Sequence, residues 1–338
     1  MNNDATLDLC NFINVLYELL PGRPHRIANR VNAKEDIYES LKSFFAKGNQ
    51  GVAPGESPWL VILRESANIQ SMTTFQSFDD LTPIYDALID WPKRLAHETP
   101  FYRRWFAEAQ VNRLLDAACG TGRHAGLFHS WGLQVQGADL SPRMIEAASA
   151  TFGTPPPAGV TWAVRGFDEP IPLPVGPLDA VVCVGNSLAL APDLATVATA
   201  IRQMLAAVRP GIGGAKGGLV ILHVLNLWSL PDGPCVWQKS RRTTLPATPS
   251  TAPGNEVLII KGVHRSGSQG YVELLITPLS NTSPEMRHET VRFLGLETAD
   301  VERAARAAGA LEVQFFGGYQ DQPYQRDKSS DMIAVIRK

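Results

Sequence analysis

The sequence predicts a doubly wound α/β fold, in which a mostly parallel sheet carries helices on both faces, together with an antiparallel β insertion and an N-terminal extension. Short apolar segments alternate with helical segments between residues 112 and 224, and this alternation is typical of βα units with right-handed crossovers. Period-two segments replace it between 227 and 294. The last two apolar segments, 311–316 and 331–336, have no helix between them, so we expect them to form an antiparallel edge pair.

The expected strands of the main sheet are short and apolar, and they cover 112–117, 133–139, 160–164, 180–184, 219–224, 311–316 and 331–336. The expected helices cover 80–90, 99–109, 123–131, 142–151, 194–208 and 298–308. Ser141 and Asp193 are expected N-caps, and Gly132 has the position of a C-terminal glycine. Together these elements predict a Rossmann-like seven-stranded sheet whose last strand runs antiparallel.

Within 227–294 the expected strands are 256–263, 271–277 and 288–293, and the first two are joined by a hairpin signal at 265–270. Loops at the carboxyl edge of such sheets commonly carry specificity. We therefore expect 227–294 to form an antiparallel insertion that acts as a substrate lid.

Residues 1–71 contain an amphipathic helix at 7–20, a weaker helix at 35–46 and a short apolar strand at 59–63. None of these segments carries recognisable chemistry. The sequence therefore predicts an N-terminal extension of unassigned role at 1–71, followed by a domain over 72–338.

Composition narrows the class of protein. The chain has 338 residues, a formal net charge of −2, 44% hydrophobic and 19% charged residues, which is ordinary for a globular protein. Basic runs stop at two residues, as at Arg103-Arg104, so neither a nucleic-acid partner nor a membrane is expected. Four widely spaced cysteines predict reduced thiols, a cytoplasmic location and no metal framework. The oligomeric state stays open.

A glycine-containing turn carries the functional signal. Asp116-Ala-Ala-Cys-Gly-Thr-Gly-Arg-His124 follows an apolar strand and opens a helix. Gly120 and Gly122 allow positive φ and a close approach of the backbone to a ligand. Asp139 ends the next strand, 23 residues after Asp116, where a carboxylate accepts hydrogen bonds from two ribose hydroxyls. The spacing predicts a nucleoside at the carboxyl ends of two neighbouring strands.

This glycine pattern, followed by Ala125, also fits a dinucleotide-binding turn. A nicotinamide-dependent oxidoreductase is therefore an alternative. The carboxylate of Asp116 favours another ligand, because it repels a pyrophosphate and suits a cation or an amino group. The closing antiparallel strand pair also disfavours the dinucleotide alternative.

In these motifs the chain resembles the class I S-adenosylmethionine-dependent methyltransferases over residues 72–338. It is most similar to small-molecule N-methyltransferases of the glycine/sarcosine type. The segments that carry the resemblance are Asp116–Gly122, Tyr85–Leu95, Cys183–Leu188 and Gly317–Lys338. The resemblance implies S-adenosyl-L-methionine as the cofactor, a small-molecule acceptor and methyl transfer, with an amine nitrogen as the expected acceptor atom.

The resemblance also implies residue roles. Ala118 and Gly120 would pass beside the methionyl portion, and Arg94 would lie near its carboxylate. Asp139 would hold the ribose. The other residues implied to contact the cofactor are Tyr85, Trp91, Leu140, Met144, Phe167, Asp168 and Val184.

Two positions depart from the glycine-type pattern. Leu225 stands before Asn226, where those members carry an arginine that pairs with the substrate carboxylate. Leu190 stands where they carry a histidine. These departures disfavour a carboxylate substrate and favour a neutral or bulkier acceptor.

Methyl transfer from a sulfonium is an in-line displacement that depends mainly on positioning, which contributes roughly 7–11 kcal/mol in well-aligned reactions. His223, at the end of the fifth strand, is the expected base, and Asn186 is expected to orient the acceptor. A non-catalytic module that only binds S-adenosylmethionine is a further alternative.

Overall fold

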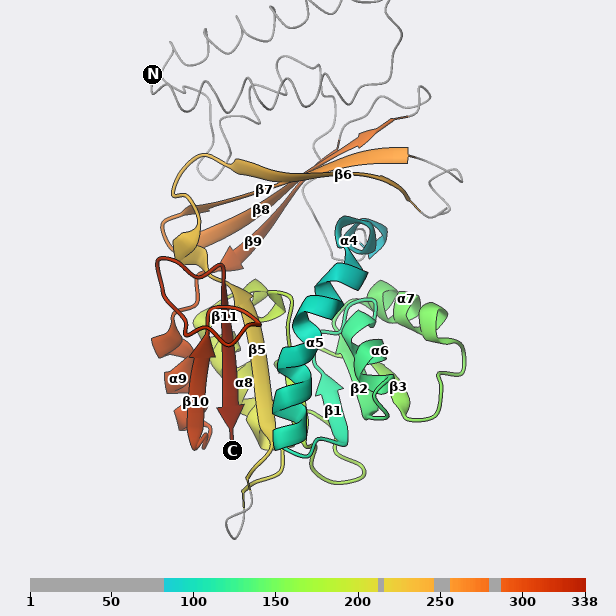
Figure 1. Cartoon of the computed structure of the whole chain (residues 1–338), viewed down its shortest axis with the longest axis vertical. Helices are drawn as coiled ribbons and strands as arrows, with labels where there is room; N and C mark the ends of the chain where they lie inside the picture. The colour runs from blue at the N-terminus through green and yellow to red at the C-terminus, as the bar shows by residue number, and fades with distance from the viewer. Residues whose placement is uncertain (1–81, 212–215, 246–255, 280–286) are drawn as a thin grey trace, which may run out of the picture. The chain divides into compact units, whose positions relative to one another are not determined.

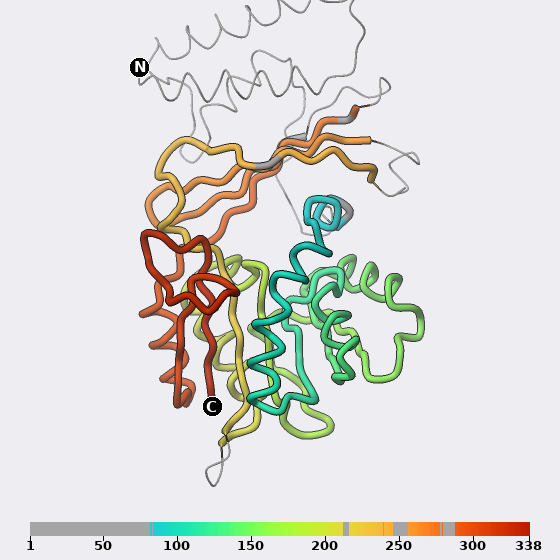
Figure 2. Tube along the Cα trace, viewed as in Figure 1, coloured from blue at the N-terminus to red at the C-terminus, as the bar shows by residue number. Residues whose placement is uncertain are grey.

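The computed structural model describes residues 82–211, 216–245, 256–279 and 287–338 (Figures 1 and 2). These residues belong to two compact units. One unit contains residues 82–230, Gly267–Tyr271 and Arg292–Lys338, and the other contains Pro231–Ser266 and Val272–Val291. The predicted extension 1–71, with its expected elements at 7–20, 35–46 and 59–63, lies outside the described residues.

The first unit is built on a seven-stranded sheet with the order β10-β11-β5-β4-β1-β2-β3. Its strands are β1 (Arg113–Asp116), β2 (Gln134–Asp139), β3 (Val160–Val164), β4 (Ala180–Cys183), β5 (Leu219–Leu225), β10 (Glu312–Phe316) and β11 (Asp331–Arg337). β11 runs antiparallel to both β5 and β10, while the other pairs are parallel. The predicted sheet with its antiparallel last strand is therefore confirmed.

The helices of this unit are α4 (Thr82–Leu88), α5 (Trp91–Glu108), α6 (Arg123–His129), α7 (Pro142–Phe152), α8 (Leu194–Ala207) and α9 (Thr298–Ala307). In Figure 1, α5 lies in front of the sheet and α8 behind it. The two predicted N-caps are confirmed, because Ser141 Oγ accepts a hydrogen bond from Met144 N at 3.2 Å and Asp193 Oδ1 accepts one from Thr196 N at 2.8 Å.

Helix α5 begins eight residues earlier than predicted, at Trp91 rather than 99. Asp90 caps it by accepting a hydrogen bond from Lys93 N at 3.2 Å. Pro100 lies inside the helix. A proline in the interior costs about 3 kcal/mol, and the apolar side chains that α5 buries immediately afterwards offset that cost.

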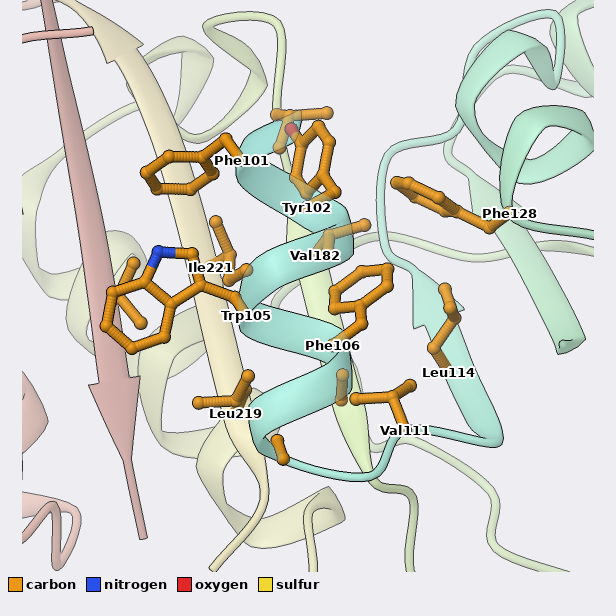
Figure 3. Close-up of a cluster of buried hydrophobic side chains, with 14 of the residues drawn as sticks. Phe101, Tyr102, Trp105, Phe106, Val111, Leu114, Phe128, Val182, Leu219 and Ile221 are labelled. Carbon is orange, nitrogen blue, oxygen red and sulfur yellow. The ribbon is translucent and has the colours of Figure 1, made fainter. Parts of the chain in front are cut away.

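Those side chains form the main core of the unit (Figure 3). Phe101, Tyr102, Trp105 and Phe106 of α5 are almost fully buried. They pack with strand residues, of which Figure 3 shows Leu114, Val182, Leu219 and Ile221. Phe128 of α6 joins the cluster, with its ring centroid 5.1 Å from that of Tyr102. The core packs α5 against the sheet. This packing places the first residues of α5 near the carboxyl ends of β1 and β4.

The second unit contains most of a four-stranded sheet with the order β6-β7-β8-β9. Its strands are β6 (Val236–Thr244), β7 (Glu256–Ser266), β8 (Gln269–Pro278) and β9 (Arg287–Leu294). The three predicted strands and the hairpin between the first two are present. β6 was not predicted, because its sequence is polar and charged, as befits an edge strand. None of the described helices is long and apolar enough to cross a membrane.

Candidate functional site

The glycine turn joins β1 to α6 with a strongly curved backbone. Gly120 has φ of 54° and Gly122 has φ of 80°, both in the left-handed region that favours glycine. A Cβ atom on Gly122 would approach Trp162 Cη2 to 2.7 Å, whereas one on Gly120 would lie 3.6 Å from Tyr85 Cε1. Gly122 is therefore required for packing as well as for conformation, and Gly120 is required for the shape of the turn beneath Tyr85.

Asp139 ties the end of β2 to this turn. Its Oδ2 accepts a hydrogen bond from Gly120 N at 2.8 Å, and its Oδ1 accepts one from Ser141 N at 3.0 Å. A carboxylate offers about four acceptor positions, so the two backbone bonds set its orientation without exhausting its acceptor capacity. This placement at the carboxyl end of β2 is the one that the ribose role requires, and that role stays a prediction.

Asp116, the last residue of β1, is 1% exposed, and neither of its carboxylate oxygens has a hydrogen-bond partner among the described residues. Burial, and then the nearby Asp139, raise the pKa of this carboxyl to about 8, although the amides of Ala118 and Ala125 and the charge of Arg94 act in the opposite direction. A buried, unsatisfied acid is costly unless a ligand completes it. A cationic ligand such as a sulfonium with an α-amino group fits this environment.

Helix α4 is held over the turn by Asp86, a residue to which the sequence assigned no role. Its Oδ1 accepts hydrogen bonds from Thr121 Oγ1 at 2.6 Å and Trp91 Nε1 at 3.0 Å, and its Oδ2 accepts one from Arg123 Nη2 at 2.7 Å. Asp86 thus connects α4, the glycine turn and the first residues of α5 and α6. Nothing in its spacing along the chain pointed to these partners.

The structure brings together three of the predicted cofactor residues. A Cβ atom on Gly185, which follows β4, would lie 3.6 Å from Arg94 Nη2 and 3.7 Å from Tyr85 Oη. The Tyr85 and Trp91 rings are 5.9 Å apart, and the Arg94 guanidinium lies 5.2 Å from the Trp91 ring centroid. Tyr85 and Arg94 therefore lie above the glycines that end β1 and β4, which is the crevice where this class of sheet binds ligands.

Arg94 is itself held by a buried acid. Its Nε donates to Glu98 Oε1 at 2.7 Å, and the other oxygen of Glu98 accepts from His124 Nε2 at 2.7 Å. Glu98 is 2% exposed and His124 is 5% exposed. The sequence assigned no role to Glu98 and treated His124 as a helix-start residue, because only the folded chain brings α5 beside α6.

His223 uses both ring nitrogens. Nδ1 accepts a hydrogen bond from Gly185 N at 3.1 Å, which leaves the proton on Nε2, and Nε2 donates to Asp331 Oδ1 at 3.0 Å. Tyr319 packs against the ring, with centroids 5.4 Å apart. The general-base role of His223 stays a prediction, and these two bonds disfavour it because they leave no ring lone pair for an acceptor proton.

Asn186 has φ of 74° directly after Gly185, and its Oδ1 accepts a hydrogen bond from Leu225 N at 2.9 Å. It therefore joins the loop after β4 to the end of β5. The neighbouring Asn226 is 2% exposed, and its amide nitrogen donates to the carbonyl oxygens of Arg326 and Ser329 at 2.6 and 2.7 Å. Both asparagines shape the rim of the crevice, and the acceptor-orienting role of Asn186 stays a prediction.

The other predicted cofactor residues follow the carboxyl ends of the strands, with Met144 in the first turn of α7. Leu140 follows β2 and is 71% exposed, which is unusual for a large apolar side chain and suits a surface that covers an adenine. Met144 and Val184 are buried, while Ala118, Phe167 and Asp168 are half-buried. A small cavity of about 140 Å³ between β1, β2, β3 and Pro172 is lined by none of the predicted site residues, so we assign it no part in the site.

Comparison with known proteins identifies the same region. Residues 114–211 match the methyltransferase domain family. Glycine N-methyltransferase of Oryctolagus cuniculus is 29% identical over 163 residues, which cover 43% of this chain and 55% of that protein. Glycine/sarcosine N-methyltransferase of Parasynechococcus marenigrum is 32% identical over 137 residues, which cover 39% of this chain and 45% of that protein. The chain thus spans about half the length of these curated relatives.

The fold is shared with solved structures. The S-adenosylmethionine-bound amino pentose methyltransferase CalS10 from Micromonospora echinaspora matches 80% of this chain and all of its own, with a TM-score of 0.55 and 20% identity. An S-adenosylmethionine-dependent methyltransferase from Clostridium acetobutylicum matches 77% of this chain and 98% of its own, with a TM-score of 0.56 and 13% identity. At these identities the likeness concerns the fold.

Proposed function

The chain belongs to the class I S-adenosylmethionine-dependent methyltransferases, and from this premise we propose that it transfers a methyl group from S-adenosylmethionine to the nitrogen of a small-molecule amine that lacks a carboxylate. One observation carries the proposal. The buried carboxyl of Asp116, which has no hydrogen-bond partner in the described part of the chain, lies beside the glycine turn to which Asp139 is hydrogen-bonded, and a cationic nucleoside cofactor would satisfy both acids.

We assign the cofactor-binding roles as follows. Asp139 accepts hydrogen bonds from the ribose, Asp116 faces the cationic portion, and Arg94 pairs with the methionyl carboxylate. The exposed side chain of Leu140 covers the adenine. The bound cofactor supplies a methyl group on a sulfonium sulfur, which is a strong leaving group.

The acceptor side is formed by the ends of β4 and β5. We propose that Asn186 and His223 act there by holding geometry, because their described bonds join Gly185 and Leu225 to the sheet. An acceptor amine then loses its proton to solvent before it attacks, and the residues align it in line with the departing sulfur. Alignment of this kind contributes roughly 7–11 kcal/mol in well-positioned reactions.

The absence of a carboxylate on the acceptor follows from Leu225. Glycine-type relatives carry an arginine at this position, whereas a leucine presents no charge to an acidic substrate. The next residue, Asn226, does not substitute for it, because its side-chain oxygen accepts hydrogen bonds from Trp228 N and Tyr324 Oη. N-methyltransferases among the relatives support nitrogen as the acceptor atom.

Two measurements test this function. Calorimetry with S-adenosylhomocysteine and with NAD should give binding for the first ligand only, and binding of NAD instead would favour an oxidoreductase. Transfer of labelled methyl groups should then be measured on amino sugars, alkyl amines, glycine and sarcosine. We expect product from amines without a carboxylate. Product from glycine alone would overturn the acceptor assignment, and cofactor binding without any product in metabolite extracts would favour a non-catalytic module.

A further inference from the structure

Arg94 is the cation that we assign to the methionyl carboxylate. Its guanidinium is also hydrogen-bonded to a buried acid of the protein, Glu98. Glu98 lies one helical turn further along α5, so the two side chains share a helix face. The guanidinium uses Nε for Glu98, while Nη2 lies on the side of Gly185. One edge of the guanidinium is therefore fixed by the protein, and another is directed to the crevice.

The second oxygen of Glu98 is held from a different element. His124 lies in the first turn of α6, two residues after Gly122, and its Nε2 is 2.7 Å from Glu98 Oε2. The carboxylate thus connects Arg94 to the helix that begins at the glycine turn. With Glu98 and His124 both buried, the connection is shielded from water.

The charges of this cluster are consistent with one ion pair and one neutral donor. Burial alone would raise the pKa of Glu98, but the hydrogen bonds from His124 and Arg94 and the charge of Arg94 outweigh burial and lower this pKa below its usual value. Burial lowers the pKa of His124 despite Glu98, so the imidazole is neutral and donates its Nε2–H. Burial would lower the pKa of Arg94, and Glu98 and Tyr85 reverse this effect, so the guanidinium keeps its charge.

We infer that Glu98 and His124 are positioning residues that fix the Arg94 guanidinium toward the carboxylate of the bound cofactor. The inference rests on the proposed function, because it needs a ligand with a carboxylate at that place. Its physical basis is preorganisation. An arginine side chain held at Nε has fewer rotamers to lose when the ligand binds, and a charged pair that is already oriented binds an anion more tightly.

Ligand selectivity distinguishes this role from a merely structural one. S-adenosylhomocysteine carries the amino-acid carboxylate, whereas 5′-methylthioadenosine carries the same nucleoside and thioether without it. In Glu98→Gln, which keeps the shape and removes the charge, we expect affinity for S-adenosylhomocysteine to fall about tenfold or more. We expect affinity for 5′-methylthioadenosine to change by no more than about twofold, because that ligand does not use Arg94.

A double-mutant cycle isolates the path through Arg94. Arg94→Met should lower affinity for S-adenosylhomocysteine on its own. Adding Glu98→Gln to Arg94→Met should lower it no further than about twofold, because a residue that acts through Arg94 has no effect once Arg94 is gone. The matched control is Glu108→Gln. Glu108 ends the same helix and accepts a hydrogen bond from Arg337 Nη2 at 2.8 Å, far from the glycine turn, so affinity for both ligands should stay unchanged.

Thermal melts show whether each variant is folded. If Glu98→Gln is not folded, the same affinity measurements on His124→Gln test the inference instead. An equal loss of affinity for both ligands, or additive losses in the cycle, would overturn the inference and assign the pair to helix packing. Failure of both Glu98→Gln and His124→Gln to fold would overturn it as well. If the unmodified protein binds neither S-adenosylhomocysteine nor 5′-methylthioadenosine, the proposed function fails first.

Discussion

The two aspartates that end β1 and β2, Asp116 and Asp139, lie in different environments. Asp139 is oriented by two backbone N–H groups, whereas Asp116 is buried with no hydrogen-bond partner among the described residues. The first environment suits an ionised acceptor for hydroxyl groups. The second disfavours the charged form. The two acids are therefore assigned to different parts of one ligand, and each assignment has its own test.

Asp139→Ala should weaken binding of S-adenosylmethionine by about 1–3 kcal/mol, because hydrogen bonds to the ribose are lost and nothing replaces them. The same substitution removes the bonds to Gly120 N and Ser141 N, so a change in the turn must be excluded. Asp139→Asn is the control, since its amide oxygen keeps one acceptor for the backbone. Calorimetry that shows wild-type affinity for Asp139→Ala would remove the ribose assignment.

Asp116 should release a proton when the cationic cofactor binds. With a pKa of about 8 the carboxyl is mostly protonated at pH 7, and a neighbouring cation favours the ionised form, so close to one proton should leave per ligand. Calorimetry in buffers of different ionisation enthalpy measures this number. Asp116→Asn has no proton to release, and its binding enthalpy should not depend on the buffer. An unchanged proton count in that variant would contradict the assignment.

The folded-state pKa of Asp116 also affects stability. Because it lies above the unfolded value of 3.8, the protonated form favours the folded state. The free energy of unfolding should therefore include a contribution that is complete below pH 3.8 and is lost as the pH rises toward 8. Asp116→Asn should remove this part of the pH dependence, which denaturant titrations across that range would detect.

Among the elements, the insertion sheet contains a buried acid with its own partners. Glu273 of β8 accepts hydrogen bonds from His264 Nε2 at 3.1 Å, His288 Nε2 at 2.7 Å and Thr290 Oγ1 at 2.6 Å. His264 Nδ1 also faces an acceptor, the carbonyl oxygen of Gly233, at 2.9 Å. One carboxylate thus links β7, β8 and β9.

This acid should make the insertion sheet sensitive to low pH. Burial would raise the pKa of Glu273, but its hydrogen bonds from His264, His288 and Thr290 lower it to about 2. A depressed pKa gives stability that is present above the unfolded value of 4.5 and lost as the pH falls toward 2. Glu273→Gln should therefore cost about 1–3 kcal/mol at pH 7 and less at pH 3.

Urea unfolding of Glu273→Gln at both pH values measures this difference. Glu256→Gln is the matched control, because Glu256 lies on β7 of the same sheet in an exposed pair with Arg242, and exposed pairs contribute little. A penalty for Glu273→Gln that does not depend on pH would show that the hydrogen bonds, rather than the charge of the carboxylate, stabilise the sheet.

At the scale of the whole molecule, the described elements that position the crevice lie in the first compact unit, which the structure describes from residue 82 onward. The sheet, the aromatic core and the cluster around Arg94 are complete within the first compact unit. The sequence of residues 1–71 carries no recognisable chemistry. The two observations predict that cofactor binding does not depend on the extension.

A chain that begins at residue 72 should therefore fold and bind S-adenosylhomocysteine with an affinity within about twofold of the full chain. Circular dichroism and calorimetry check the two parts of this prediction. Deletion of 1–71 that yields insoluble protein, or protein without affinity for the ligand, would place the extension in the core instead.

The sequence by itself determined the order of strands and helices, the glycine turn, the N-caps at Ser141 and Asp193 and the family, because each depends on residues close together in the chain. Propensity, period and capping are local properties. The predicted start of α5 at residue 99 was wrong, because the helix begins at Trp91 and its aromatic side chains pack into the core of the fold. The sequence also did not predict β6, whose charged residues lack the period of a half-buried strand.

Only the tertiary structure decided which side chains meet. Asp86 with Thr121, Glu98 with His124 and Gly185 with His223 are pairs that lie 26 to 38 residues apart in the chain. The local sequence pattern does not predict such pairs, since they form only when helices and strands pack around one crevice. The same packing gives both nitrogens of His223 a hydrogen-bond partner and, within the residues that the structure describes, gives Asp116 none. Whether a buried polar atom has a hydrogen-bond partner can be determined only from the folded structure, because it depends on every group that surrounds that atom.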